Sequence, residues 1–234
     1  MPTAMVSGAS LGIGRAVALK LAHQGFDIAV NARRPDGLQQ LVAELQEVRP
    51  QGTFLSLPTD MSQKEDVRAF AQMVLAQWPR IDVLVNNAGL FKPGTVHEEP
   101  DGQMEEVLTT NLHSAYYLTR AIVPAMKEAG QGHIFNMCST ASIDAYENGG
   151  SYCIAKHAMY GMHKVLRKEL KQYGIKVTAL LPGPTYTASW EGVDLPMERF
   201  MQPQDVAACL WNAFVLSQSA VVEDVVMRPL PGDI

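Results

Sequence analysis

The sequence lacks the features that mark membrane, secreted and nucleic-acid-binding proteins. No stretch approaches the roughly 18 consecutive apolar residues of a membrane-spanning helix, and the first residues carry no basic segment followed by an apolar one. The 19 basic residues are scattered and the net charge is −5, so neither nucleic acid nor an anionic membrane surface is expected as a partner. We expect a cytoplasmic protein.

Cysteine is also scarce. Cys138, Cys153 and Cys209 are odd in number and form no Cys-x-x-Cys pattern, so reduced and buried thiols are expected. The six histidines show no metal-ligand spacing, and no metal site is predicted. Glu98 and Glu99 are interpreted as a solvated pair rather than as an acid/base dyad.

Short apolar runs alternate with longer segments that have apolar residues at three- and four-residue spacing. The runs are typical of strands buried on both faces, and the longer segments are typical of helices. The predicted strands are residues 3–6, 27–31, 53–57, 82–85, 133–137, 176–181 and 221–227. The predicted helices are residues 13–24, 37–48, 64–77, 102–128, 152–173 and 203–216. This alternation predicts one α/β domain of the Rossmann type, with a seven-stranded, doubly wound parallel sheet.

Local signals mark where the helices begin and end. Helix N-caps are expected at Asp36, Ser62, Asp101 and Ser151, and helix ends at Gly25, Gly130 and Gly174. Residues 182–202 show no clear element but contain Trp190, Met197 and Phe200. Their apolar character favours a flexible substrate flap at about 188–202 over a disordered loop.

A glycine-rich turn joins the first predicted strand to the first helix. Gly8 permits a sharp turn, Gly12 lets backbone N–H groups approach a phosphate, and Gly14 lets the helix and strand pack closely. Glycines alone fit a turn without a ligand equally well. Their position in an α/β chain favours a dinucleotide site, which is expected to include Gly8, Ser10, Leu11, Gly12, Ile13 and Gly14.

The spacing Gly-x-x-x-Gly-x-Gly resembles that of the short-chain dehydrogenase/reductase family, and four further motifs follow in register. They are Asn86-Asn87-Ala88-Gly89, Asn111, Ser139 with Tyr152-x-x-x-Lys156, and Pro182-Gly183. The resemblance spans about residues 3 to 227. It implies an oxidoreductase that transfers a hydride between a nicotinamide cofactor and a carbonyl or alcohol.

The end of the second strand suggests which cofactor binds. Dinucleotide folds that bind NAD place a carboxylate there, whereas this chain has Arg33 and Arg34. A guanidinium group can grip a 2′-phosphate, so NADP(H) is expected rather than NAD(H), although a solvated arginine pair is the alternative. The resemblance also implies cofactor contacts from Asp60, Met61, Asn87, Ala88, Gly89, Tyr152, Lys156, Pro182, Gly183, Thr185 and Thr187.

The Tyr152–Lys156 pair is the predicted acid/base group. The two residues lie one helical turn apart, and the Lys156 ammonium is expected to lower the pKa of the Tyr152 phenol. Such pairs on helices are usually structural, but the family motifs around this one favour catalysis. The resemblance implies that Ser139 hydrogen bonds the substrate oxygen and that Asn111 holds a water molecule linked to Lys156.

The substrate is expected to be a small carbonyl or alcohol, of the 3-oxoacyl, 3-hydroxy-acid or pterin type. Predicted contacts come from residues 90–95, 144–147 and 188–202, with Tyr146, Trp190, Met197 and Phe200 forming an apolar wall or part of the core. The basic residues of the predicted helix 152–173 could bind an acyl-carrier partner or could simply form a solvated helix face. A homodimer or homotetramer is expected from the resemblance. The rival hypothesis is a nucleotide-sensing protein of the same fold without chemistry.

Overall fold

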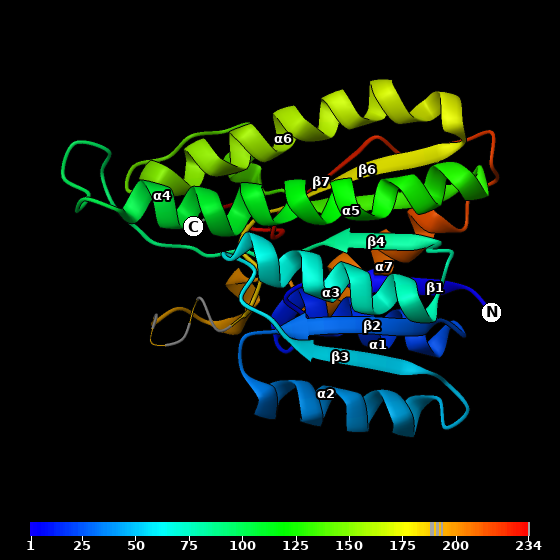
Figure 1. Cartoon of the computed structure of the whole chain (residues 1–234). Coiled ribbons are helices and arrows are strands. Elements are labelled where there is room, and N and C mark those ends of the chain that lie inside the picture. Colours follow the sequence, from blue (N-terminus) through cyan, green and yellow to red (C-terminus); the bar gives the residue numbers. More distant parts are fainter. Residues whose placement is uncertain (188–189, 191, 193, 234) are drawn as a thin grey trace.

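The computed structural model describes residues 1–187, 190, 192 and 194–233. Within them a seven-stranded sheet runs through the centre, with strand order β3-β2-β1-β4-β5-β6-β7 and every adjacent pair parallel (Figure 1). The strands are β1 (Thr3–Val6), β2 (Asp27–Ala32), β3 (Phe54–Pro58), β4 (Val83–Asn86), β5 (Gly132–Met137), β6 (Ile175–Pro182) and β7 (Asp224–Met227). The predicted doubly wound Rossmann-type fold is confirmed.

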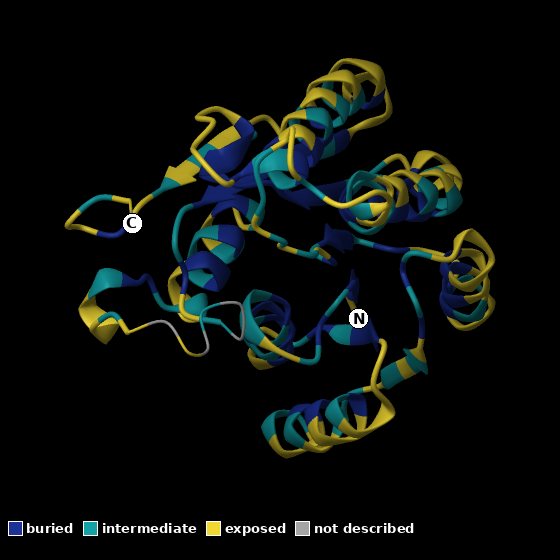
Figure 2. Ribbon diagram, turned by 90° about the vertical axis from the view of Figure 1, so that its left-hand side faces the viewer, coloured by how far each residue is buried: buried dark blue, intermediate teal, exposed yellow. Residues whose placement is uncertain are grey.

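Helices cover both faces of the sheet. On one face lie α1 (Gly12–His23), α2 (Pro35–Val48) and α7 (Pro203–Phe214), whose apolar sides share one buried cluster. On the other lie α3 (Lys64–Gln77), α4 (Gln103–Leu108), α5 (Ser114–Ala129) and α6 (Gly150–Leu170). Figure 2 shows the buried residues concentrated in the sheet and on the helix sides that face it. Helices on both faces explain why the inner strands are continuous apolar runs.

The edge strands differ from the prediction. β3 and β7 contain exposed residues, whereas every residue of β1 and β4 is buried. β7 also begins at Asp224 rather than at residue 221. An edge strand has one neighbour and is covered less completely, so the expectation of burial on both faces was wrong for these two strands.

The predicted helix over residues 102–128 contains a π-helical turn at Thr109–His113, between α4 and α5. Such a turn inserts an extra residue and often marks a functional site. Here it contains Asn111, which is fully buried. Periodicity alone could not reveal this interruption, because the apolar pattern continues on both sides of it.

Helix ends were predicted better than helix starts. Gly25, Gly130 and Gly174 have left-handed backbone angles just after the helices they end, as expected. The N-cap predictions were wrong: the caps are Arg34, Gln63, Gly102 and Gly149 in place of Asp36, Ser62, Asp101 and Ser151. Asp36 and Ser151 lie inside the first helical turns instead. Pro35 explains the first case, because proline favours the first helical position.

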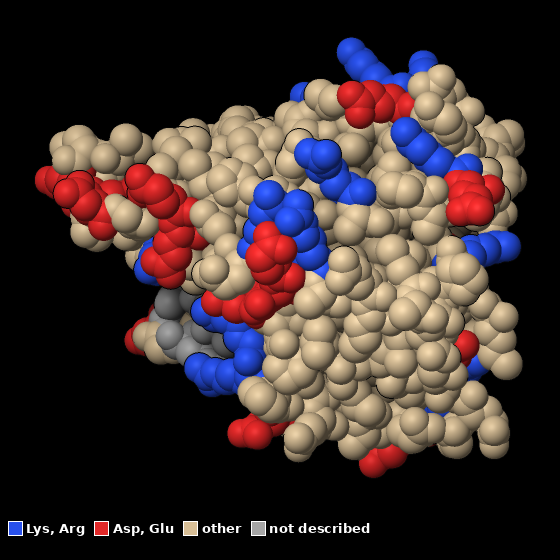
Figure 3. Space-filling view, in the orientation of Figure 1, with Lys and Arg blue, Asp and Glu red and all other residues tan. Residues whose placement is uncertain are grey.

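The described residues also show whether the chain has a membrane-spanning helix, disulfides or a metal-ligand cluster. No helix among them is both long enough and apolar enough to cross a membrane. Cys138, Cys153 and Cys209 are free thiols; Cys138 and Cys153 are buried as expected, whereas Cys209 is only partly buried. The described histidine, cysteine and acidic residues form no group of three that could hold a metal ion. Basic side chains on the face seen in Figure 3 are interspersed with acidic ones. The charge pattern predicted from the sequence therefore carries over to this face.

Candidate active site

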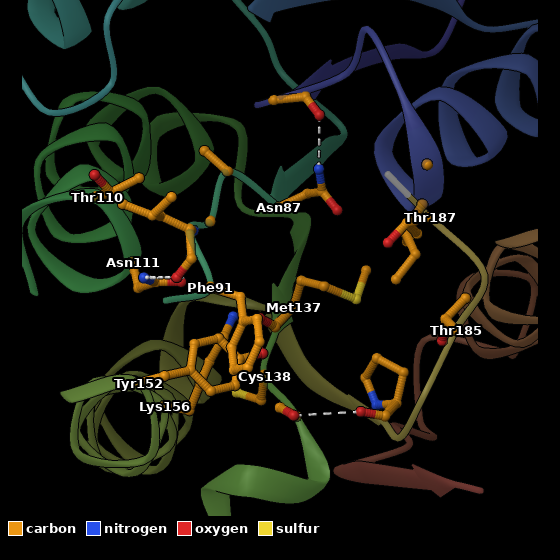
Figure 4. Close-up of a pocket in the computed structure, with 18 of the residues that line it drawn as sticks. Asn87, Phe91, Thr110, Asn111, Met137, Cys138, Tyr152, Lys156, Thr185 and Thr187 are labelled. Atoms are coloured by element: carbon orange, nitrogen blue, oxygen red, sulfur yellow. Dashed lines mark hydrogen bonds between the residues drawn. The ribbon is translucent and has the colours of Figure 1, made fainter. Parts of the chain in front are cut away.

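A cavity of about 650 Å³ opens at the carboxyl ends of the central strands. This is where ligands bind in open α/β sheets, because the chain crosses from one face to the other there. The cavity is lined by nearly all of the predicted site residues: Gly8, Ser10, Leu11, Gly12, Ile13, Arg33, Asp60, Met61, Asn87, Ala88, Gly89, Asn111, Ser139, Tyr152, Lys156, Pro182, Gly183, Thr185 and Thr187. Figure 4 shows Tyr152, Lys156 and Asn111 on one side and Thr185 and Thr187 on the other.

The glycine turn is held in place by hydrogen bonds from Asn87, on the loop after β4. Asn87 donates from Nδ2 to the main-chain oxygens of Ser7 and Gly8, at 2.9 Å each. Ser7 Oγ in turn accepts from the N–H groups of Asn87 and Ala88 at 3.0 Å. Gly8 has φ of +64°, and a Cβ there would lie 2.8 Å from Ala88 Cα. The turn and the Asn-Asn-Ala-Gly loop therefore form one rigid unit.

The start of α1 faces the cavity without a side-chain cap of its own. Leu11 occupies the N-cap position, and a leucine side chain cannot accept the free N–H groups of the first turn. Gly12, with φ of +56°, lies so close to Thr187 that a Cβ would be 2.9 Å from its Cγ2. The helix start thus offers N–H donors that have no side-chain partner among the described residues, and a positive dipole end, to an anion in the cavity.

Two predicted cofactor contacts lie outside the cavity lining. Gly14 is buried between Asn87 and the turn, so it serves the packing of helix and turn. Arg34 caps α2 with its backbone, and its side chain is exposed away from the lining. Of the arginine pair, Arg33 lines the cavity and Arg34 does not. Arg34 lies outside this lining, and its contact with the cofactor stays a prediction.

Asp60 and Met61 line the far end of the cavity, between the glycine turn and α3. The Asp60 carboxylate accepts from the N–H of Ser62 at 2.9 Å, which fixes its orientation. Asn31 links this end to the turn: its Nδ2 contacts Met61 Sδ at 2.7 Å and its Oδ1 accepts from Gly8 N–H at 2.9 Å. Sequence reasoning missed Asn31, which looked like one more residue of a buried strand.

Tyr152 and Lys156 lie together at the opposite end. Lys156 is 4% exposed, and its Nζ donates to the main-chain oxygen of Met137 at 2.8 Å while lying 5.7 Å from the centre of the Tyr152 ring. Phe91 packs edge-on against Tyr152, with ring centres 5.0 Å apart (Figure 4). Phe91 belongs to the predicted substrate segment 90–95, and the contact confirms that this loop reaches the site.

The protonation of this pair differs from the prediction. Burial raises the pKa of the Tyr152 phenol to about 12, and the Ser139 hydroxyl offsets part of that rise. Burial also lowers the pKa of Lys156 to about 8. The sequence predicted a tyrosine pKa below 10. In this structure the free-energy cost of removing water from the phenolate is larger than the stabilisation that the charge of Lys156 supplies. Lys156 is half neutral near pH 8, and its Nζ is directed at a carbonyl oxygen.

Asn111 ties the π turn to the loop after β4. Its Nδ2 donates to the main-chain oxygens of Leu90, at 2.8 Å, and Val107, at 2.9 Å, and its Oδ1 accepts from Leu90 N–H at 3.2 Å. In an uninterrupted α-helix the Val107 carbonyl would accept from the main-chain N–H of residue 111. The π turn thus makes this carbonyl accessible to a side chain, and Asn111 is oriented by it.

Ser139 follows β5 and begins a short 3-10 turn. Its Oγ accepts from Ala141 N–H at 3.1 Å and lies 3.4 Å from the Pro182 carbonyl oxygen, and Ser142 Oγ accepts from the Ser139 N–H in return. This reciprocal cap fixes the serine at the cavity wall. The nearby hydroxyl of Ser142 is therefore used in holding Ser139.

The substrate end of the cavity includes Asp144, Ala145, Tyr146 and Trp190. Two members of the predicted apolar wall are elsewhere: Phe200 is buried against Tyr186 and Trp190, and Met197 is 49% exposed. Of the predicted flap, residues 188–189, 191 and 193 lie outside the described residues. These placements favour core packing for Phe200, one of the two alternatives that the sequence left open.

Some cavity residues were missed by sequence reasoning. Asp233, near the end of the chain, lines the cavity and accepts from Arg228 Nε at 2.8 Å, while Arg228 also contacts Asp144 at 2.5 Å. The others are Ala32, Thr59, Ser62, Glu106, Thr110, Met137, Cys138, Thr140 and Pro184. Most adjoin a predicted residue in the chain, so widening each motif by one position would have found them. Asp233 carried no such signal.

A doubly wound parallel sheet, with a glycine turn between its first strand and first helix and a cavity at the strands' carboxyl ends, defines a Rossmann-type nucleotide-binding domain. The model of the short chain dehydrogenase family matches residues 2–196. The chain belongs to the short-chain dehydrogenase family and is an oxidoreductase.

Relatives and solved structures agree with this assignment over nearly the whole chain. The sepiapterin reductase of Chlorobaculum tepidum is 30% identical over 239 residues, covering 98% of this chain and 97% of that protein. A metagenomic short-chain oxidoreductase in complex with NADP is 31% identical with a TM-score of 0.85, covering 97% and 96% of the two chains. An alcohol dehydrogenase from the archaeon Thermococcus sibiricus, complexed with 5-hydroxy-NADP, is 26% identical with a TM-score of 0.90, covering 98% and 97%.

Proposed function

We propose that this oxidoreductase uses NADP(H) to reduce a small carbonyl compound, with Tyr152 as the general acid. The main observation behind this proposal is that two sets of residues line the same cavity. The glycine turn and Arg33 line this cavity, and so do Asn111, Ser139, Tyr152 and Lys156. A site that only sensed a nucleotide would need the first set alone, so the second set favours an enzyme over a sensor.

The cavity fits a dinucleotide phosphate. The uncapped start of α1 would hold the pyrophosphate, and Arg33 would hold the 2′-phosphate. Asp60 and Met61 would contact the adenine, Asn87 with the Ala88 and Gly89 backbone the adenosine ribose, and Thr185 and Thr187 the nicotinamide carboxamide. The related structures complexed with NADP and with 5-hydroxy-NADP support NADP(H) as the cofactor. When bound, the nicotinamide supplies the two electrons that reduce the carbonyl carbon.

The chain's own residues supply the proton. With a pKa of about 12, the Tyr152 phenol holds its proton at neutral pH and can donate it to the carbonyl oxygen as negative charge develops there. Ser139 Oγ, fixed at the cavity wall by its reciprocal cap, would donate a hydrogen bond to the same oxygen. Lys156, with a pKa of about 8, is the group best matched to returning a proton to Tyr152 near neutral pH. Asn111 would hold the water that links Lys156 to solvent.

The substrate class that fits best is a compact 3-oxoacyl, 3-hydroxy-acid or pterin-type carbonyl compound. Phe91, Tyr146 and Trp190 offer flat apolar surfaces at the substrate end, and Asp144 offers a hydrogen-bond acceptor. The likeness to a sepiapterin reductase supports the pterin-type alternative. A flap over about residues 188–202 would close the site over such a molecule.

Assembly into a homodimer or homotetramer is part of the proposal. Tyr116 on α5 is 42% exposed, and Ile154 and Val165 on α6 are 41% and 53% exposed. Adjacent helices that both present large apolar side chains to solvent favour a contact between copies of the chain. Light scattering coupled to size-exclusion chromatography measures the state directly. A monomer at all concentrations would remove this part of the proposal.

The test is a panel of ketones, aldehydes, 3-oxo esters and oxidised pterins, followed by NADPH absorbance, with Tyr152→Phe as the variant. The phenylalanine keeps the packing against Phe91 and removes the proton. We expect turnover to fall at least a hundredfold while the Kd for NADPH changes less than threefold. Undiminished turnover in Tyr152→Phe would refute the role of the phenol. No turnover of any panel member, with NADPH bound tightly, would favour the nucleotide sensor.

A further inference from the structure

Glu98 and Glu99, the acidic pair in the loop after β4, lie in two different environments. Glu98 is the solvated residue that the sequence predicted, with a side chain 72% exposed. Glu99 is not solvated in this way, so the prediction was wrong for it. Its Oε1 accepts from the main-chain N–H of Ser151 at 2.8 Å, and its Oε2 accepts from the Ser151 hydroxyl. Glu99 thus crosses from the loop to the first turn of α6, 52 residues along the chain.

Two glycines, Gly94 and Gly150, make room for this carboxylate. Gly94 and Gly149 form a parallel bridge, and Gly94 N–H donates to the Asn148 carbonyl at 2.9 Å. A Cβ at Gly94 would lie 2.7 Å from Glu99 Cγ, and a Cβ at Gly150 would collide with Glu99 Oε1. Gly150 also has φ of +29°. The close approach of loop and helix therefore depends on residues without side chains.

The first turn of α6 needs a partner from outside. Gly149 is its N-cap residue and has no side chain that could accept the free N–H groups. A carboxylate at a helix N-terminus is stabilised by the helix dipole as well as by its hydrogen bonds. The Ser151 hydrogen bonds accordingly lower the pKa of Glu99, so it is ionised at neutral pH. Glu99 supplies the cap that the helix lacks.

Tyr152 directly follows Ser151, the residue that Glu99 contacts. The same loop that ends in Glu99 carries Phe91, whose ring packs edge-on against the Tyr152 ring at 5.0 Å. The loop begins at Leu90, which Asn111 holds through both its N–H and its carbonyl. Residues 90–99 therefore contact α6 on both sides of the tyrosine: Phe91 touches its ring and Glu99 fixes the peptide that precedes it.

We propose that Glu99 is a positioning residue, which acts through Ser151 to hold the Tyr152 phenol at the orientation needed for proton transfer. This inference rests on the proposed function, because it needs Tyr152 to be the general acid. Catalytic geometry is sensitive to displacements near 1 Å, which can cost about a hundredfold in rate. Loss of the Glu99 cap would let the first turn of α6 fray and increase the spread of phenol positions. NADPH binding, to which the glycine turn and Arg33 are proposed to contribute most, would change little.

The test compares Glu99→Ala, Glu99→Gln and the matched control Glu98→Ala, each on the full-length protein with NADPH and the best substrate of the carbonyl panel. In Glu99→Ala we expect kcat to fall about tenfold, with KM and the Kd for NADPH within twofold of the parent. Glu99→Gln keeps an acceptor for the Ser151 N–H, so its kcat should return to within threefold of the parent. Glu98→Ala should leave kcat, KM and Kd unchanged.

Several outcomes separate this inference from its alternatives. A kcat within twofold of the parent in Glu99→Ala would overturn it, and so would an equal loss of kcat and NADPH affinity, which indicates general unfolding. Should Glu99→Ala not fold, Ser151→Ala removes one of the two contacts, and it must lower kcat about threefold for the inference to stand. Tyr152→Phe is measured in parallel. If it retains turnover, the proposed function fails; if it does not and Glu99→Ala is normal, the positioning role alone fails.

Discussion

Lys156 Nζ lies 2.8 Å from the main-chain oxygen of Met137 and 5.7 Å from the centre of the Tyr152 ring. The ammonium is thus held beside the tyrosine by a backbone carbonyl of β5 rather than by a carboxylate. A buried charge without a countercharge is costly, and burial lowers the pKa of Lys156 accordingly. Lys156 therefore lowers the stability of the folded protein.

Replacing Lys156 by Met should stabilise the protein while removing its activity. A fall in pKa from 10.5 to about 8 corresponds to about 3 kcal/mol against the charged form. The lost hydrogen bond to Met137 offsets about 1 kcal/mol of this. We therefore expect a gain of about 2 kcal/mol in the free energy of unfolding at pH 7, measured by urea denaturation.

The pH dependence of this gain has a definite direction. Below pH 8 both folded and unfolded Lys156 hold a proton, so the full penalty applies to the parent. Between pH 8 and 10.5 the folded lysine releases its proton first, and the parent becomes more stable relative to Lys156→Met. The gain should shrink over that range. Lys168→Met, an exposed position on the same helix, should change stability by less than about 0.5 kcal/mol, and a destabilised Lys156→Met at pH 7 would contradict the argument.

Arg33→Ala should weaken NADPH binding at least tenfold and NADH binding less than threefold. The guanidinium lines the cavity, and NADH has no 2′-phosphate for it to bind. Fluorescence titration with the two cofactors measures both constants. Arg34→Ala is the control, because Arg34 lies outside the lining, and it should leave both constants within twofold. Equal weakening of NADPH and NADH binding in Arg33→Ala would remove the 2′-phosphate assignment.

Two glycine-to-alanine substitutions should have opposite effects. A Cβ at Gly14 would collide with Asn87 Nδ2 and lie 2.5 Å from the Gly8 carbonyl oxygen, so Gly14→Ala must displace the turn. We expect it to cost about 2 kcal/mol or more in unfolding free energy and to weaken NADPH binding at least tenfold. Gly161, in α6, has open space around its Cβ position, and Gly161→Ala should stabilise by about 1 kcal/mol. Thermal unfolding with and without NADPH measures both changes.

His133 should contribute to acid unfolding. It is 2% exposed, and burial with the nearby Lys176 lowers its pKa to about 3. The unfolded chain binds a proton at this histidine below pH 6.5 and the folded chain does not, so stability falls as the pH drops from 6.5 towards 3. His133→Gln should remove about 2–3 kcal/mol of the loss between pH 7 and 4.5. His23→Gln, at an exposed position, should leave the slope unchanged; an unaltered slope in His133→Gln would mean that the folded protein protonates this residue.

Local sequence patterns predicted the central part of this structure and failed where distant segments meet. Gly25, Gly130 and Gly174 end helices because left-handed angles are a local preference of glycine. The four catalytic candidates were identified because they occur in register with the motifs of the short-chain dehydrogenase/reductase family, and the glycine turn because it lies between the first strand and the first helix. The cap of α6 was missed because its acceptor, Glu99, comes from another loop and matches no helix-start pattern.

Two other features were beyond local reasoning for the same reason. Asp233 reaches the cavity through contacts with Arg228 and Arg199, which depend on where the chain goes after β7. The pKa of Tyr152 depends on how completely the fold removes water from the phenol, and the four-residue spacing to Lys156 carries no information on that. The sequence therefore indicated the candidate groups, whereas their protonation depends on the fold.

The π turn at Thr109–His113 has a consequence for how this region tolerates insertions and deletions. One residue is accommodated there beyond the α-helical repeat, so deleting a residue within the turn would restore an ordinary helix. Everything upstream would then rotate by about 100° about the helix axis relative to α5. Glu106 and Val107 would move to new azimuths, and the amide of Asn111 would lose both carbonyl acceptors at once. A gap of one residue here should therefore be far more damaging than most substitutions in the same helix.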